Sequence, residues 1–187
     1  MIEEVRKSKE YIASGGVIIY PTDTIWGIGC DATNPVSVER IYKIKQRADN
    51  KSMLVLVNGL SMLETYLESV PEQAKEILAS ARKPTTIIYP AAKNLASNLL
   101  GDDGSVGIRI TTDPFCKQLI EQTGKPLVST SANISGALSP ALFSHIEKEI
   151  LEKADYVVQW RQEETEPSTP SAIIKLSKQG NILVLRP

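Results

Sequence analysis

The chain has 187 residues, of which 42% are hydrophobic and 23% are charged, and this suffices for one domain with a sizeable core. Its 21 lysine and arginine residues are balanced by 22 aspartate and glutamate residues, and a net charge of −1 argues against a histone-like or arm-type nucleic-acid binder. Its cysteines, Cys30 and Cys116, form no CxxC pair, and no apolar run reaches the roughly 20 residues that span a bilayer, so we expect a cytoplasmic protein without a disulfide framework, zinc–thiolate site or membrane segment.

The N-terminal residues predict a helix over 2–14, because Ile2, Val5 and Ile12 lie on one helical face and a Gly-Gly pair follows. The β-branched run 17–20, closed by Pro21, predicts a buried strand. Asn34 is the expected cap of the next helix, with proline at its first position.

The remaining elements follow in chain order. We predict a strand over 53–57, helices over 59–68 and 71–82, strands over 85–89 and 106–110, a helix over 114–124, a strand over 127–129, a helix over 142–153, and strands over 156–159, 172–176 and 182–185. Strands and helices alternate without a strict βαβ rhythm, which indicates a single α/β domain over 1–187 around a mixed sheet. The proline-containing segment 163–171 is expected to be a mobile surface loop.

Two nucleotide-binding patterns can be weighed directly. The Walker A pattern is absent. Residues 27–32 match GxGxx[GA], and Asp49 follows at the spacing of a dinucleotide fingerprint, but the glycines do not join a strand directly to a helix. We therefore interpret Gly27 and Gly29 as a plain tight turn and keep a Rossmann-type oxidoreductase as the weakest alternative.

Hydroxyl-rich and basic segments lie where several predicted elements end. They are 21–24, the triplet at 45–47 with Lys51 beyond it, 105–109 and 129–133. Each alone is ordinary turn, capping or helix-end chemistry. Together they favour an anion site at the carboxyl ends of the strands, where hydroxyls and backbone N–H groups surround a phosphate and cations neutralise it.

The same segments carry a resemblance to a known family. YPTDTIWGIGCDA, IYKIKQR, GIRIT and KPLVSTSANISG, in this order, resemble the YrdC-like L-threonylcarbamoyladenylate synthases over nearly the whole chain. The signature is the K-x-R of Lys45 and Arg47 paired with the S-x-N of Ser131 and Asn133. The resemblance implies a strongly twisted mixed sheet around a deep central cleft. It also implies that L-threonine, bicarbonate (or CO2) and ATP yield L-threonylcarbamoyladenylate and pyrophosphate, for modification of the adenosine beside the tRNA anticodon.

The resemblance also implies roles for individual residues. Lys45 and Arg47 are the expected catalytic cations, at the exposed end of a helix. The expected ATP-binding residues are Lys45, Arg47, Lys51, Ser105, Ser131, Asn133, Ser139 and Arg186. The expected threonine-binding residues are Thr24, Arg109, Ser129 and Ser171. Mg²⁺ is expected to arrive with ATP, held mostly by phosphate oxygens and water, with no metal site built by the protein.

Arg109 is informative without the resemblance. An arginine between Ile108 and Ile110 is unusual within a strand unless it meets an anion, although an outward-facing residue on a solvated face fits the same alternation. The single histidine, His145, is expected on a surface helix without a catalytic role. A carbamate nucleophile is already anionic, so the reaction needs no Ser-His or Cys-His pair.

A second function class stays open at this point. A non-catalytic module that binds double-stranded RNA or tRNA would fit a protein connected with tRNA, but the charge balance and the low aromatic content of 5% count against it. The expected partners are the three substrates, with tRNA or double-stranded RNA and the downstream proteins that transfer threonylcarbamoyl groups to tRNA as further possibilities.

Overall fold

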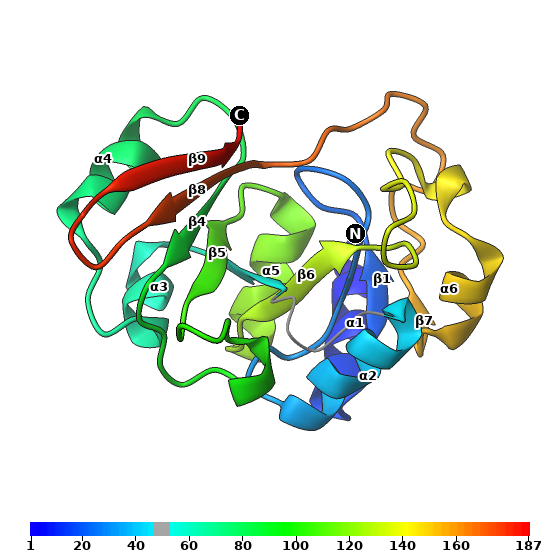
Figure 1. Cartoon of the computed structure of the whole chain (residues 1–187). Helices are drawn as coiled ribbons and strands as arrows, with labels where there is room; N and C mark the ends of the chain where they lie inside the picture. Colours follow the sequence, from blue (N-terminus) through cyan, green and yellow to red (C-terminus); the bar gives the residue numbers. More distant parts are fainter. Residues whose placement is uncertain (47–52) are drawn as a thin grey trace.

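The structure, a computed structural model, describes residues 1–46 and 53–187 (Figure 1). The strands of the described part are β1 (Ile18–Tyr20), β2 (Gly27–Gly29), β3 (Leu54–Val57), β4 (Thr85–Tyr89), β5 (Val106–Ile110), β6 (Leu127–Ser131), β7 (Tyr156–Val157), β8 (Ala172–Leu176) and β9 (Ile182–Arg186). They form one nine-stranded sheet in the order β7-β1-β2-β6-β3-β5-β4-β8-β9. Three pairs are parallel, β1 with β7, β3 with β5 and β4 with β8, and the other pairs are antiparallel, so the predicted mixed α/β sheet is confirmed.

Apart from α6, the helices of the described residues begin and end close to the predicted positions. They are α1 (Ile2–Ala13), α2 (Pro35–Lys45), α3 (Leu60–Tyr66), α4 (Glu72–Ser80), α5 (Pro114–Thr123) and α6 (Lys148–Lys153), with short 3-10 helices η1 (Ser97–Leu99) and η2 (Phe143–His145). The Asn34 side chain accepts hydrogen bonds from the N–H groups of Val36 and Ser37, which confirms the predicted cap of α2. Gly124 ends α5 in the left-handed conformation at φ 64°.

The glycine pair 27 and 29 forms a strand, so both sequence interpretations of it are wrong. β2 lies between β1 and β6, and the pair is neither a tight turn nor a phosphate-binding loop. A Cβ at Gly29 would overlap the Val128 carbonyl oxygen and lie 2.9 Å from the Tyr20 ring. Glycine is needed here because β6 and the Tyr20 ring approach the backbone closely. Asp49, the acid of the supposed fingerprint, lies outside the described residues.

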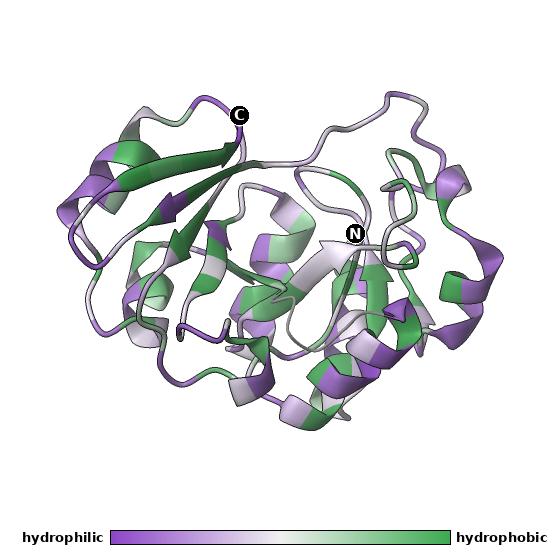
Figure 2. Cartoon of the chain, in the orientation of Figure 1, coloured by the Kyte–Doolittle hydropathy of each residue, from purple (hydrophilic) through white to green (hydrophobic). Residues whose placement is uncertain are grey.

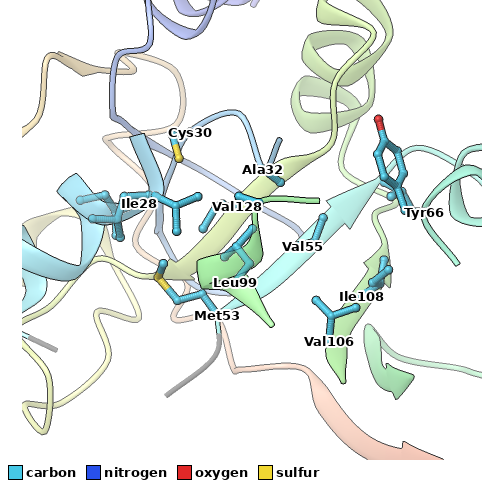
Figure 3. Close-up of a cluster of buried hydrophobic side chains, with 14 of the residues drawn as sticks. Ile28, Cys30, Ala32, Met53, Val55, Tyr66, Leu99, Val106, Ile108 and Val128 are labelled. Carbon is cyan, nitrogen blue, oxygen red and sulfur yellow. The ribbon is translucent and has the colours of Figure 1, made fainter. Parts of the chain in front are cut away.

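One face of the sheet is covered by helices α2, α3 and α4. Alternate strand residues point to this side, and Figure 3 shows Ile28, Val55, Ile108 and Val128 among the packed side chains. The helices contribute buried residues such as Ile41 to the same cluster. Period-two alternation of the strands places these residues together, and their burial removes most of this face from water.

The opposite face of the sheet is covered over only part of its area. Helices α1 and α5 pack there on Tyr20, Leu56 and Leu127, in a second cluster of buried residues. Figure 1 shows the two helices beneath the middle of the sheet, away from β8 and β9. The rest of this face, beyond the ends of α1 and α5, is available for a ligand.

Two predictions about the C-terminal half need correction. The helix predicted over 142–153 is broken into η2 and α6, and His145 is an exposed residue of η2. Segment 163–171 contains no helix or strand and runs from the β7 side to β8 (orange in Figure 1), but its last residue, Ser171, is only 2% exposed. The end of the expected surface loop is therefore part of the packed structure.

Within the described residues, no helix has the length and apolarity to cross a bilayer.

Candidate functional site

A cavity of about 260 Å³ lies on the partly covered face of the sheet. Its lining comes from β2 to β6 and β8, the loop before β2, the end of segment 163–171 and β9. The residues are Thr24, Ile25, Trp26, Gly27, Met53, Leu54, Thr86, Ile88, Gly107, Arg109, Ser129, Thr130, Ser131, Ser139, Pro170, Ser171, Ile173 and Arg186. We expected a site at the carboxyl ends of the strands, and the structure corrects this: the cavity lies over the strands themselves.

Strand alternation explains why this cavity is polar. In β5, Val106 and Ile108 pack in the core, whereas Gly107 and Arg109 face the cavity. In β6, Val128 points to the core while Ser129 and Ser131 point the other way. Figure 2 shows β6 turning from green to pale toward its arrowhead, where its serine and threonine residues follow Leu127 and Val128. Hydroxyls and one guanidinium group thus occupy alternate positions of otherwise apolar strands.

All four residues predicted to bind threonine line this cavity. Thr24 comes from the loop between β1 and β2, Arg109 from β5, Ser129 from β6 and Ser171 from the residue before β8. Each is buried, with an exposure between 2% and 7%. The chain therefore brings together side chains from position 24 to position 171.

Arg109 is not on a solvated face. Its NH2 group lies 3.0 Å from Oδ1 of Asp23, and the two side chains are 2% and 9% exposed. Its Nε has no hydrogen-bond partner among the described residues, and neither has Asp23 Oδ1. The cavity thus contains a buried guanidinium whose charge is balanced by one carboxylate and whose hydrogen-bonding capacity is not used up.

Arg186 is a second guanidinium group of the cavity. Its Nε donates to the Ser171 carbonyl oxygen at 2.7 Å, and its NH2 lies 3.5 Å from the Ser171 hydroxyl. The same hydroxyl is 2.8 Å from Oγ1 of Thr86. Partial burial, with the nearby positive charge of Arg109, lowers the pKa of Arg186. The resemblance predicts that Arg186 binds ATP. In the structure Arg186 contacts Ser171, which is one of the residues predicted to bind threonine.

The two halves of the signature meet in space. Lys45 Nζ donates to the carbonyl oxygens of Ser131 and of Asn133, the latter at 2.7 Å. The Lys45 carbonyl oxygen in turn accepts from the N–H of Ser135 at 2.8 Å. Asn133 Nδ2 donates to the carbonyl oxygens of Ile134 and Ala137, which fixes the same loop. Lys45 is 1% exposed, so the expectation of an exposed helix-end cation is wrong for this residue.

The other residues predicted to bind ATP are distributed unevenly. Ser131 and Ser139 line the cavity, whereas Lys45, Asn133 and Ser105 are not among its lining residues. Ser105 lies in the turn before β5, where its N–H donates to Oδ1 of Asp103 at 3.0 Å. Arg47 and Lys51 lie outside the described residues. The nucleotide assignments of all these residues stay predictions.

Sequence reasoning missed several residues of the cavity. Trp26 is 4% exposed, packs on Phe143 with ring centroids 4.9 Å apart and forms one wall. Thr86 was passed over although it alternates with buried Ile87 in a strand, which is the same signal that singled out Arg109. Asp23 belongs to the PTDT segment at 21–24, but nothing in the sequence shows that its carboxylate lies beside Arg109.

The buried thiols and the Tyr20 phenol of the described residues are not activated nucleophiles. Burial raises the pKa of the Cys116 and Cys30 thiols and of the Tyr20 phenol, so these groups are held neutral. Both cysteines are free thiols. Within residues 1–46 and 53–187, no three His, Cys, Asp or Glu side chains are grouped as a metal site would need. What the cavity provides is hydrogen-bond donors, hydroxyls and positive charge.

Known proteins share this fold and sequence pattern. A threonylcarbamoyl-AMP synthase of Pseudoalteromonas translucida (strain TAC 125) is 35% identical over 174 residues, covering 91% of each chain. The fold matches E. coli YciO with a TM-score of 0.83 and 25% identity, over 97% of this chain and 87% of that one. It matches a double variant of P. abyssi Sua5 with a TM-score of 0.88 and 26% identity, and the same protein complexed with L-threonine with 0.84 and 24%.

The coverage differs between these relatives. This chain is covered to 98% by both P. abyssi Sua5 structures but spans only 56% and 53% of their length, about half. A family model described as telomere recombination, Sua5–YciO–YrdC, matches residues 10–187. Because that match and the curated relative both extend over nearly the whole sequence, the chain belongs to the Sua5–YciO–YrdC family.

Proposed function

We propose that this protein synthesises L-threonylcarbamoyladenylate from L-threonine, bicarbonate or CO2 and ATP, with release of pyrophosphate. The observation that carries the proposal is the buried Arg109 guanidinium facing a cavity with the hydroxyls of Thr24, Ser129 and Ser171. A guanidinium group suits a carboxylate, and buried hydroxyls suit a ligand that itself carries a hydroxyl. Threonine has both groups.

The relatives support the same substrate class. The name threonylcarbamoyl-AMP synthase belongs to proteins that are 35% and 36% identical to this chain. P. abyssi Sua5 has been solved with L-threonine, and at 24% identity that likeness supports the shared fold. The substrate therefore rests on the named relatives and on the cavity, and together they favour an enzyme over a non-catalytic RNA-binding module.

The chemistry would use positioning and charge instead of a covalent enzyme intermediate. The threonine nitrogen forms a bond to the carbon of CO2 and loses a proton, which gives a carbamate. A carbamate oxygen then attacks the α-phosphorus of ATP, and the bond from this phosphorus to the bridging oxygen of pyrophosphate breaks. The obstacle is the approach of an anion to a polyanion, which cations and fixed hydrogen-bond donors relieve.

On the nucleotide side, Lys45 shapes the loop after β6 through the carbonyl oxygens of Ser131 and Asn133. Ser131, the last residue of β6, and Ser139, in this loop, both line the cavity. Arg47 and Lys51 are proposed to supply positive charge to the phosphates. Mg²⁺ is proposed to enter as Mg-ATP, coordinated by phosphate oxygens and water.

The wider setting is part of the same proposal. The product would serve the threonylcarbamoyl modification of adenosine beside the tRNA anticodon, through downstream transfer proteins, in the cytoplasm. Direct binding of tRNA is testable by filter binding over a salt series. A steep loss of affinity with salt would indicate a phosphate-contacting surface.

The central experiment mixes the protein with L-threonine, bicarbonate and Mg-ATP and follows pyrophosphate release, with mass spectrometry of the nucleotide product. We expect pyrophosphate release to require all three substrates and the product to carry the threonylcarbamoyl group on AMP. Omission of each substrate in turn is the control. ATP turnover that is indifferent to threonine would contradict the proposal.

A further inference from the structure

Two guanidinium groups, Arg109 and Arg186, line one small cavity, and one carboxylate is paired with the first of them. That carboxylate, Asp23, is itself 9% exposed and is not among the residues that line the cavity. Its contact with a cavity residue is the ion pair with Arg109. Its charge acts on the cavity through Arg109.

The position of Asp23 is fixed by groups other than Arg109. Oδ2 accepts from the N–H of Thr112 at 3.2 Å and from its hydroxyl at 3.3 Å. The loop that carries Asp23 is held as well: Arg161 NH1 donates to the Thr22 carbonyl oxygen at 3.1 Å, and Thr24 N–H donates to the Thr22 hydroxyl at 2.9 Å. A long arginine side chain thus meets a carboxylate whose location is already set.

The ion pair leaves Arg109 with donors to spare. Asp23 Oδ1 and Arg109 NH2 form an ion pair at 3.0 Å. Within the described part of the chain, however, Asp23 Oδ1 accepts no hydrogen bond and Arg109 Nε donates none. Asp23 balances the charge of the guanidinium without occupying all its hydrogen-bonding sites. Such an arrangement suits an arginine that has to accept a second carboxylate.

We propose that Asp23 is a positioning residue, which holds Arg109 for the carboxylate of an amino acid and lowers the positive charge of this subsite enough to exclude polyphosphate. The proposal rests on the proposed function, because only an enzyme that uses both an amino acid and ATP needs this discrimination. The Asp23 carboxylate offsets the charge of Arg109, so the amino-acid side of the cavity adds little positive charge of its own. Without that carboxylate, Arg109 would add a full positive charge near Arg186, a predicted ATP-binding residue, and the cavity would favour pyrophosphate and the ATP phosphates.

The test is Asp23→Asn, which keeps the size of the side chain and an oxygen acceptor for Thr112 but removes the charge. We expect the KM for threonine to rise about 10–100-fold, the size of one lost charge-assisted contact, with the KM for ATP and kcat within about threefold of wild type. Pyrophosphate should become a competitive inhibitor against threonine. A merely structural aspartate would lower thermal stability without this split between the two KM values.

A matched control variant is Asp155→Asn. Asp155 also pairs with an arginine, Arg40, at 2.9 Å and accepts from a backbone N–H, that of Val17, at 2.6 Å, but it is not a cavity residue. It should lose stability and keep both KM values. Thr112→Val is a milder second variant, because Thr112 is exposed and only its hydroxyl contact to Asp23 is lost. It should raise the threonine KM in the same direction.

The outcomes separate this inference from the proposed function. Threonine-dependent pyrophosphate release by the wild type is measured first, and its absence defeats the proposed function. Calorimetric titration of pyrophosphate alone, without ATP or threonine, then still tests Asp23, since Asp23→Asn should bind it more tightly or at a higher stoichiometry than the wild type. Unchanged pyrophosphate binding, or a threonine KM within twofold of wild type, overturns the role given to Asp23.

Discussion

Replacing Arg109 by lysine tests the amino-acid site most directly. Lysine keeps a positive charge beside Asp23, so the buried carboxylate is not left alone, but the planar fork is lost. A carboxylate held by two parallel N–H···O bonds would keep one, and a charge-assisted bond contributes about 1.5–3 kcal/mol. We therefore expect the KM for threonine to rise by about 10–150-fold. The KM for ATP should stay near the wild-type value, because Arg109 is a predicted threonine-binding residue, whereas Ser131 at the end of β6 and Ser139 in the loop after it are the predicted nucleotide residues.

The assay is pyrophosphate release at saturating Mg-ATP over a range of threonine concentrations, with direct threonine binding by calorimetry. Arg40→Lys is the control, since Arg40 makes a comparable arginine–aspartate pair with Asp155 outside the cavity. Arg109→Met adds a stability readout, because an aspartate buried without its partner costs about 3–5 kcal/mol. If Arg109→Lys binds and uses threonine as the wild type does, Arg109 does not hold the carboxylate and the reasoning fails.

Three further predictions follow from the same structure. Lys45→Met should lose most threonine-dependent turnover and lower the free energy of unfolding, measured by denaturant titration, by about 1–3 kcal/mol, because the buried Lys45 amino group donates to the carbonyl oxygens of Ser131 and Asn133. A variant as stable as the wild type would support the interpretation of Lys45 as an exposed cation at the helix end. Gly29→Ala should lower the free energy of unfolding by about 3 kcal/mol or more, since its Cβ would overlap the Val128 carbonyl oxygen, and an unchanged melting temperature would contradict the register of β2 with β6. In kcat/KM, threonine should exceed serine by about 10–200-fold and valine by about 10⁴-fold; valine equal to serine would exclude recognition of the hydroxyl.

Much of the fold was predictable from the sequence, because local signals and burial agreed. The strands over Thr85–Tyr89, Val106–Ile110 and Ala172–Leu176 have the predicted bounds, since each contains β-branched residues and is flanked by turn or loop residues. The cap at Asn34 was predictable for a similar reason. At these positions local preference and tertiary packing require the same structure.

The sequence misled where a tertiary contact decides the structure. Gly27 and Gly29 resemble a turn locally, but β1 and β6 on either side make them a strand. The last turn of α2 resembles a solvated helix end, but the loop after β6 folds over Lys45 and buries it. In both cases the deciding group is far along the chain, and no window of neighbouring residues contains it.

The candidate site was predictable as a set of residues but not as an arrangement. The family resemblance predicts that Thr24, Ser129 and Ser171 belong to one site. The position of Arg109 between two isoleucines indicates that its side chain meets an anion. Neither pattern shows that Asp23 lies beside Arg109, or that Arg186 contacts Ser171. Charges that meet across a sheet are fixed by register, and register depends on pairing of distant strands.

The division of one sheet face explains why a cavity forms there at all. Helices α1 and α5 bury Leu56 and Leu127, whereas Leu54 and Ser129, two residues away along each strand, line the cavity, and Leu54 also packs against the edge of the buried cluster. Residues two apart share a face, so the same strands supply core under the helices and cavity lining beyond them. An apolar residue in place of Ser129 would extend the core into the site. The polar lining of the cavity is therefore not required by the packing of α1 and α5, and the proposed ligand, with its carboxylate and hydroxyl, would account for it.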